Sequence, residues 1–155
     1  MAVPVPAAAK RMCERSGWSL SNLELQKLLY IAHMFHLGET GEPLIIGRFE
    51  AWDYGPVQPT LYHMAKVFGS SPVKNIFHTA PPIEGRPEAD TVDSAVDQLG
   101  NEPPGRLVAI THWDKGAWAR FYVPGERGIV IPNDAIRQEY EDRKNGVRAA
   151  RAASA

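Results

Sequence analysis

Residues 21–38 read SNLELQKLLYIAHMFHLG, and this stretch decides the expected fold. Ser21 and Glu24 have the spacing of a capping box, in which each side chain bonds the other residue's backbone N–H at the start of a helix. Apolar residues then recur every three or four positions, at Leu25, Leu28, Leu29, Ala32 and Phe35. This spacing puts them on one face of a helix. The stretch predicts a helix that starts at Ser21, ends at Gly38 and packs one face into the core.

Shorter elements are expected on both sides of this helix. Apolar periodicity between Pro and Gly boundaries predicts helices over residues 6–16, 57–68, 88–99, 107–113 and 117–122, and a last helix from 133 or 134. Runs rich in β-branched and aromatic residues predict strands in the 44–54 region, with 73–79 and 129–131 as further candidates. We expect a compact, helix-rich α+β domain with a small antiparallel sheet over residues 1–145, followed by a flexible C-terminal tail, 146–155.

The composition supports one folded domain. The 155 residues are 44% hydrophobic and 23% charged, close to the averages of globular proteins. Apolar stretches are far shorter than the roughly 20 residues of a membrane span, and Lys10 and Arg11 follow the apolar N-terminal residues, unlike in a secretory signal. We therefore expect a cytoplasmic protein without a membrane partner. The side chains expected in its core are Leu28, Leu29, Phe35, Trp52, Leu61, Phe68 and Tyr140.

The charge balance disfavours nucleic acid as a partner. Seventeen Lys and Arg face eighteen Asp and Glu, which gives a formal net charge of −1, whereas DNA-binding domains carry a basic excess. A short basic run from Arg143 to Arg151 keeps a DNA-binding autorepressor open as an alternative. A solvated helix end is the more ordinary interpretation of that run.

Motifs for catalysis or metal binding are weak in this sequence. His33 and His36 are three residues apart, but the sequence contains no HExxH, phosphate-binding loop or GxSxG motif. The single cysteine, Cys13, excludes an internal disulfide. We expect no enzyme, no cofactor, no metal and no catalytic residue. A hydrolase that uses His112 and Asp114, with Cys13 as one possible nucleophile, stays open as an alternative.

Two surfaces are candidates for binding a partner. The first lies in Phe49–Val57, FEAWDYGPV, where aromatic side chains offer rigid contact area: Trp52, Asp53, Tyr54, Gly55 and Pro56. The alternative for this stretch is that its aromatic residues only wall the core. The second surface is the acidic side of the 88–99 helix, formed by Asp90, Asp93 and Asp97, which suits a basic partner. A solvated helix face is the ordinary interpretation of those charges.

Several blocks together resemble a known family. They are Leu25–Tyr30 (LQKLLY), Pro43–Leu44, Glu50–Val57 (EAWDYGPV), Thr111–His112 with Trp118, and Ile129–Tyr140. In order and spacing these blocks resemble the SocA-like Panacea-domain family of antitoxins, and the resemblance covers about residues 21–140. It implies an antitoxin that binds its cognate toxin, a SocB-like protein, and acts as an adaptor that delivers the toxin to the ClpX unfoldase of the ClpXP protease. Neutralisation by binding alone is the simpler alternative.

Overall fold

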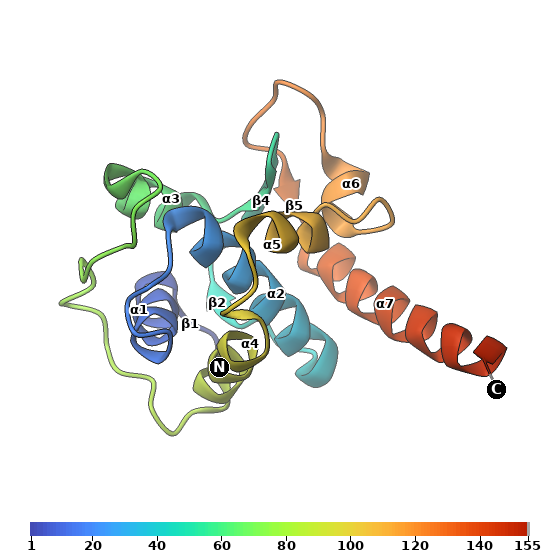
Figure 1. The fold of residues 1–155 in the computed structure, drawn as a ribbon, viewed down its shortest axis with the longest axis horizontal. Helices are drawn as coiled ribbons and strands as arrows, with labels where there is room; N and C mark the ends of the chain where they lie inside the picture. Colours follow the sequence, from blue (N-terminus) through green and yellow to red (C-terminus); the bar gives the residue numbers. More distant parts are fainter. Residues whose placement is uncertain (155) are drawn as a thin grey trace.

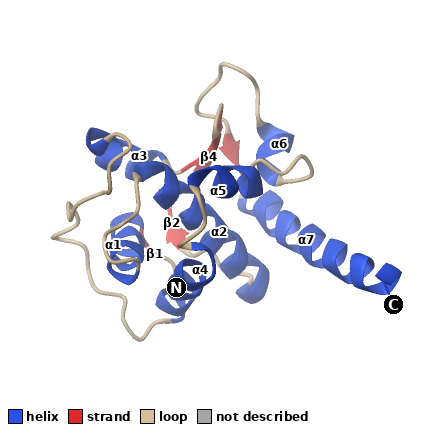
Figure 2. Cartoon of the chain, in the orientation of Figure 1, coloured by secondary structure: helices blue, strands red, loops and turns tan. Residues whose placement is uncertain are grey.

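The computed structural model describes residues 1–154 as a helical domain with two small sheets (Figure 1). The helices are α1 (Val5–Arg15), α2 (Asn22–Thr40), α3 (Pro59–Ala65), α4 (Pro87–Leu99), α5 (Pro104–Thr111), α6 (Ala117–Phe121) and α7 (Asn133–Ser154), with a 3-10 turn at Lys66–Phe68. The strands are β1 (Val3–Pro4), β2 (Ile45–Ile46), β3 (Phe49–Trp52), β4 (Gly55–Val57) and β5 (Val130–Ile131). The expected α+β class is confirmed (Figure 2).

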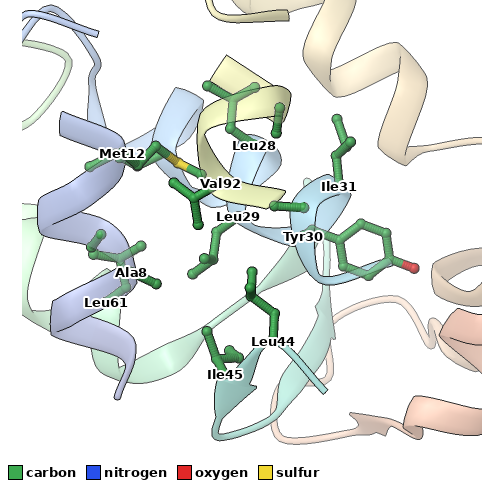
Figure 3. Packing of buried hydrophobic residues seen from close by; sticks show 14 of the residues in the cluster. Ala8, Met12, Leu28, Leu29, Tyr30, Ile31, Leu44, Ile45, Leu61 and Val92 are labelled. Atoms are coloured by element: carbon green, nitrogen blue, oxygen red, sulfur yellow. The ribbon is translucent and has the colours of Figure 1, made fainter. Parts of the chain in front are cut away.

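Helix α2 is the centre of the domain, and α1, α3, α4, α5 and α7 all pack against it. Leu28 and Leu29 are fully buried, as expected, and Figure 3 shows them beside Met12 of α1 and Val92 of α4. Trp52 and Leu61 are also buried as expected, whereas Phe35, Phe68 and Tyr140 pack against the core but are only partly buried. Because α2 is covered on nearly all sides, its polar residues are buried along with its apolar ones.

The sequence predicted the start of α2 correctly but not its end. Ser21 accepts a hydrogen bond from the backbone of Glu24, whose side chain accepts from the backbone of Ser21, so the predicted capping box is present. The predicted end at Gly38 is wrong, since the helix continues to Thr40 and stops at Gly41 with φ 79°. A Cβ at Gly38 would collide with the Tyr140 ring of α7. This glycine therefore allows close helix packing and does not cap the helix.

The antiparallel sheet has the strand order β4-β3-β5. It confirms strands in 49–54 and 129–131, but Gly55–Val57 is the edge strand β4 and not the start of a helix. Ile45–Ile46 lies outside this sheet, because it pairs in parallel with β1. The expected strand over 73–79 is wrong. That segment is a loop, in which the Val73 amide donates to the Leu20 carbonyl at 2.8 Å beside an isolated bridge between Ser21 and Pro72.

A buried carboxylate fastens α7 to the rest of the fold. Glu139 is 2% exposed; its Oε1 accepts hydrogen bonds from the Tyr30 hydroxyl at 2.8 Å and the Ala117 amide at 2.9 Å. Its Oε2 accepts from Arg143 Nε at 2.8 Å. Beyond this point α7 projects away from the domain (Figure 1) and stays helical to Ser154, through most of the segment expected to be a flexible tail. Residue 155 lies outside the described residues.

Candidate functional site

The block from Phe49 to Val57 forms a β-hairpin with a two-residue tip. Trp52 pairs with Gly55 across the strands, which leaves Asp53 and Tyr54 at the turn. Tyr54 is 77% exposed. The Asp53 carboxylate accepts from the Tyr122 hydroxyl at 2.7 Å and the Gly125 amide at 3.2 Å, and these bonds lower the pKa of Asp53. The hairpin thus exposes the Tyr54 side chain to solvent on a turn that the hydrogen bonds of Asp53 hold in place.

Trp52 itself is held inside the structure. Its indole N–H donates to Glu50 Oε1 at 3.0 Å, and its ring lies edge-on to Tyr62 with 4.8 Å between centroids. The Arg127 guanidinium lies over the same ring at 4.2 Å from its centroid. Trp52 is therefore buried, as expected for a core residue, and Tyr54 is the aromatic residue of the turn that faces outward.

An aromatic stack supports the base of the hairpin. His112, Trp118 and Tyr122 stack in order, with centroid separations of 4.1 and 4.6 Å. Trp118 also donates its indole N–H to the Trp52 carbonyl at 2.7 Å. The residue after α5, a residue of α6 and the residue after α6 therefore fix the position of the hairpin, although they are about 60 residues away in sequence.

Two polar residues of α2 complete the edge of the sheet. The Gln26 side chain accepts from the Gln58 amide at 2.7 Å and donates to the Gln58 carbonyl at 3.1 Å, as a neighbouring strand would. Lys27 Nζ donates to the Pro56 carbonyl at 3.2 Å. Because Pro56 has no N–H to offer, an edge position suits it. The LQKLLY and GPV blocks of the sequence thus meet directly.

Lys27 is a buried cation under the hairpin. It is 2% exposed, and burial lowers its pKa to about 8. Gly55, with φ 114°, leaves the space that both Lys27 and His112 use: a Cβ there would lie 2.9 Å from Lys27 Nζ and 3.1 Å from His112 Nε2. Burial lowers the pKa of His112, and the nearby Lys27 charge adds to this effect. Gly55 is therefore required by the close approach as well as by its backbone conformation.

A pocket of about 350 Å³ opens beside Lys27. The predicted residues Trp52, Asp53 and Tyr54 line it, whereas Gly55 and Pro56 lie beside Lys27 and do not line it. Val57, the last residue of the predicted stretch, also lines it. The remaining lining residues were not predicted from the sequence: Asn22, Leu23, Gln26, Lys27, Tyr62, Lys66, Gly69 and Arg127. The one local signal for them is the polar pair Gln26–Lys27 inside an otherwise apolar helical stretch.

Two of the three carboxylates on the acidic face of α4 are paired with arginines of α1. Asp93 forms two hydrogen bonds with Arg11 of α1, at 2.8 and 2.6 Å, and Asp97 forms two with Arg15, at 2.9 and 2.7 Å. Both carboxylates are thus neutralised within the domain. Asp90 is exposed and, within residues 1–154, has no side-chain partner.

Some of the residues that a hydrolase or a DNA-binding autorepressor would use have structural contacts, whereas Arg148 and Arg151 of the basic run are exposed. Cys13 is fully buried, and burial raises its pKa to about 12, so it is a protonated thiol at neutral pH. Asp114 is exposed, and His112 lies in the stack described above. Arg143 of the basic run binds Glu139 and lies over the Trp113 ring at 4.6 Å.

Neither a metal cluster nor a membrane-spanning helix is found in the described part of the chain. In residues 1–154, no group of three or more His, Cys, Asp or Glu side chains is placed to hold a metal ion. No helix over the same residues is both long and apolar enough to cross a membrane.

Comparison with known proteins places the chain in a family. The family described as "Antitoxin SocA-like, Panacea domain" matches residues 25–119, which include the hairpin, Lys27, His112 and Trp118. Antitoxin SocA of Caulobacter vibrioides (strain NA1000 / CB15N) is 34% identical over 109 residues, which cover 64% of this chain and 58% of that protein. The chain thus spans less than two thirds of this relative, and no solved structure matches it. Since the family match covers more than half of the chain, the chain belongs to the SocA-like Panacea-domain family.

Proposed function

We propose that this chain is the antitoxin of a toxin–antitoxin pair and that it binds its cognate toxin directly. The observation that carries the proposal is the family match over residues 25–119, supported by the likeness to a curated antitoxin. The matched residues converge on one place in the fold, where LQKLLY of α2, the hairpin and the His112–Trp118 stack meet. A rigid hairpin that carries an exposed tyrosine beside a pocket is suited to binding a protein.

The hairpin is the surface that we assign to the toxin. Tyr54 projects from a turn that Tyr122 and Gly125 hold in place, so it loses little conformational freedom on binding. The acidic face of α4 is the weaker candidate, because a partner there must compete with Arg11 and Arg15 for the carboxylates. Of that face, only Asp90 keeps a free charge in the described structure.

We further propose that the chain acts as an adaptor that delivers the toxin, a SocB-like protein, to the ClpX unfoldase of ClpXP, and that it works in the cytoplasm. An adaptor must hold two partners at once, so it needs two separable surfaces. The hairpin belongs to β3 and β4, while Asp90 lies on α4, a separate element that packs on α1 and α2. These two places leave room for two partners.

Two experiments test these proposals in turn. Affinity purification of the tagged chain from its native host, followed by mass spectrometry, is expected to recover one small partner protein in stoichiometric amount. Recovery of no partner in stoichiometric amount would contradict direct toxin binding. Purified ClpXP is then expected to degrade that partner several times faster when the chain is present. Equal degradation rates with and without the chain would contradict the adaptor role, and neutralisation by binding alone would be the remaining explanation.

A further inference from the structure

We propose that the pocket beside Lys27 binds the C-terminal residue of a partner polypeptide, with its carboxylate at Lys27 and an apolar side chain against Trp52 and Tyr62. This inference names the contact chemistry of the partner and rests on the proposed function for the partner's identity. It rests on three features of the pocket. They are an under-partnered cation, an unpartnered acceptor and an apolar wall.

The cation is Lys27. An ammonium group has three N–H donors, and within residues 1–154 the one acceptor bonded to Lys27 is the Pro56 carbonyl. No carboxylate in the described structure pairs with it, although it is 2% exposed and lines the pocket. Burying an ammonium without a counter-charge costs free energy unless something compensates it. A bound anion supplies that compensation.

The acceptor is the amide oxygen of Asn22. Asn22 is 7% exposed and lines the pocket, and its Oδ1 has no hydrogen-bond partner among the described residues. Buried polar atoms in native proteins are nearly always bonded. Asn22 is also the first residue of the 19-residue helix α2, where the helix dipole favours an anion. A ligand in which an N–H donor lies next to an anionic group can bond Asn22 Oδ1 and place its negative charge near the start of α2.

The other residues that line the pocket indicate that its ligand has an apolar group and a negative charge. Trp52, Tyr62, Val57 and Leu23 provide apolar surface, and the rim carries Lys66, Arg127 and Asp53. The Asp53 carboxylate is already bonded to Tyr122 and Gly125. The lining therefore holds three cationic side chains against one engaged carboxylate. Charge complementarity selects an anion.

The last residue of a polypeptide supplies all three groups from one place. Its α-carboxylate suits Lys27, its backbone N–H suits Asn22 Oδ1, and an apolar side chain suits the aromatic wall. A volume of about 350 Å³ has room for such a residue. An internal Asp or Glu side chain brings the carboxylate without the apolar group, so it is the weaker occupant.

Nuclear magnetic resonance titration of the full chain tests this with small probes. N-acetyl-L-phenylalanine carries the carboxylate, the N–H and an aromatic side chain, and N-acetyl-L-phenylalaninamide is the same molecule without the charge. The acid is expected to shift the amide resonances of residues 22–27 and 52–58 in a saturable manner, and the amide is expected to bind at least tenfold more weakly. Equal binding of the two, or no binding of the acid, would overturn the proposal. So would equal or tighter binding of N-acetyl-L-glutamyl amide, whose carboxylate is on the side chain.

A matched pair of variants tests the role of Lys27. Lys27→Met keeps the length of the side chain and is expected to lower the affinity for N-acetyl-L-phenylalanine at least tenfold. Lys115→Met, an exposed lysine outside the pocket, is expected to leave it unchanged. Retained affinity in a folded Lys27→Met protein would contradict the proposal.

A pH titration of the wild-type chain gives the same test without a substitution. Because the pKa of Lys27 is about 8, its charge is lost above that pH, and the affinity for the acid is expected to fall at least severalfold between pH 7 and 9. The other titratable or charged groups that face Lys27 or the pocket are His112, whose lowered pKa leaves it neutral over this range, Asp53, Lys66 and Arg127. The same fall is expected to be absent in Lys27→Met. A flat profile in the wild-type chain would contradict the proposal.

These outcomes separate the pocket from the proposed function. If the probe binds but no toxin partner is found, the pocket proposal stands and the antitoxin role is contradicted. If a toxin binds but the probe does not, the proposed function stands and the pocket proposal is contradicted.

Discussion

Two buried charges of this protein, Glu139 and Lys27, have opposite surroundings. Both side chains are 2% exposed. Glu139 accepts hydrogen bonds from Tyr30, Ala117 and Arg143. Lys27 has the Pro56 carbonyl as its one bonded acceptor within residues 1–154. The first charge is satisfied by the fold and the second is not.

The difference separates a structural charge from a candidate functional one. A buried ion that is fully paired and hydrogen-bonded holds elements together, and removing it leaves its partners unsatisfied. A buried ion with little compensation lowers the stability of the folded state and needs another reason to be present. Glu139 joins α7 to α2 and α6, while Lys27 faces a pocket. Substitutions at these two positions are therefore expected to have opposite effects on stability.

Removing Glu139 is expected to have the largest effect. Glu139→Ala leaves the Arg143 guanidinium, the Tyr30 hydroxyl and the Ala117 amide without their acceptor, so the free energy of unfolding is expected to fall by about 3–5 kcal/mol. Urea denaturation followed by circular dichroism measures this. The control is Glu141→Ala, two residues along the same helix, which is expected to change stability by less than about 0.5 kcal/mol. Similar losses for the two variants would remove the structural role of Glu139.

The charge of Lys27 is expected to lower the stability of the folded chain, whereas that of Glu139 raises it. Burial lowers its pKa from 10.5 to about 8 in the folded chain. Between those two pH values the unfolded chain keeps a proton that the folded chain has released, so stability rises with pH. Relative to Lys27→Met, the wild-type chain is expected to gain up to about 3 kcal/mol of unfolding free energy from pH 8 to pH 10.5. The comparison with the variant cancels the titration of other groups.

A constant difference between the wild-type chain and Lys27→Met over this pH range would contradict the assignment of Lys27 as an uncompensated buried cation. Lys27→Met is itself expected to fold, because a methionine of similar length removes the cost of desolvating the charge.

The ion pairs of α4 are expected to contribute least. Asp93→Asn weakens the paired hydrogen bonds to Arg11, which are partly exposed, so a loss of about 1 kcal/mol is expected. The loss is expected to shrink in roughly 1 M salt, since screening weakens partly exposed charges. A salt-independent loss as large as that of Glu139→Ala would place this pair with the structural charges.

Features set by neighbouring residues were predictable from the sequence. The Ser21–Glu24 capping box and the burial of Leu28 and Leu29 follow from spacing alone. Gly38 was misassigned as a helix end because its role is set by Tyr140, about one hundred residues away. Gly55 and Pro56 looked like the end of a strand, but they belong to the edge strand β4, which pairs with β3. On its outer side Lys27 of α2 bonds the Pro56 carbonyl, and Gln26 bonds Gln58 just after the strand.

The candidate site, too, has a part that the sequence indicated and a part that only the fold reveals. The stretch Phe49–Val57 was chosen for its density of aromatic residues, but the hairpin that it forms was not predicted. Asn22, Lys66 and Arg127 were missed, because only the tertiary fold brings them to the same pocket. The acidic residues Asp93 and Asp97 were chosen for their regular spacing, which does not reveal that Arg11 and Arg15 face them.

The central claim is that the hairpin, and not the acidic helix, binds the partner. Calorimetric titration of the co-purified partner into the wild-type chain, Tyr54→Ala and Asp93→Asn tests it most directly. Because Tyr54 is 77% exposed, its removal is not expected to affect folding. We predict at least a tenfold loss of affinity for Tyr54→Ala and a change of less than about twofold for Asp93→Asn. Unchanged affinity for Tyr54→Ala, together with a large loss for Asp93→Asn, would contradict the claim.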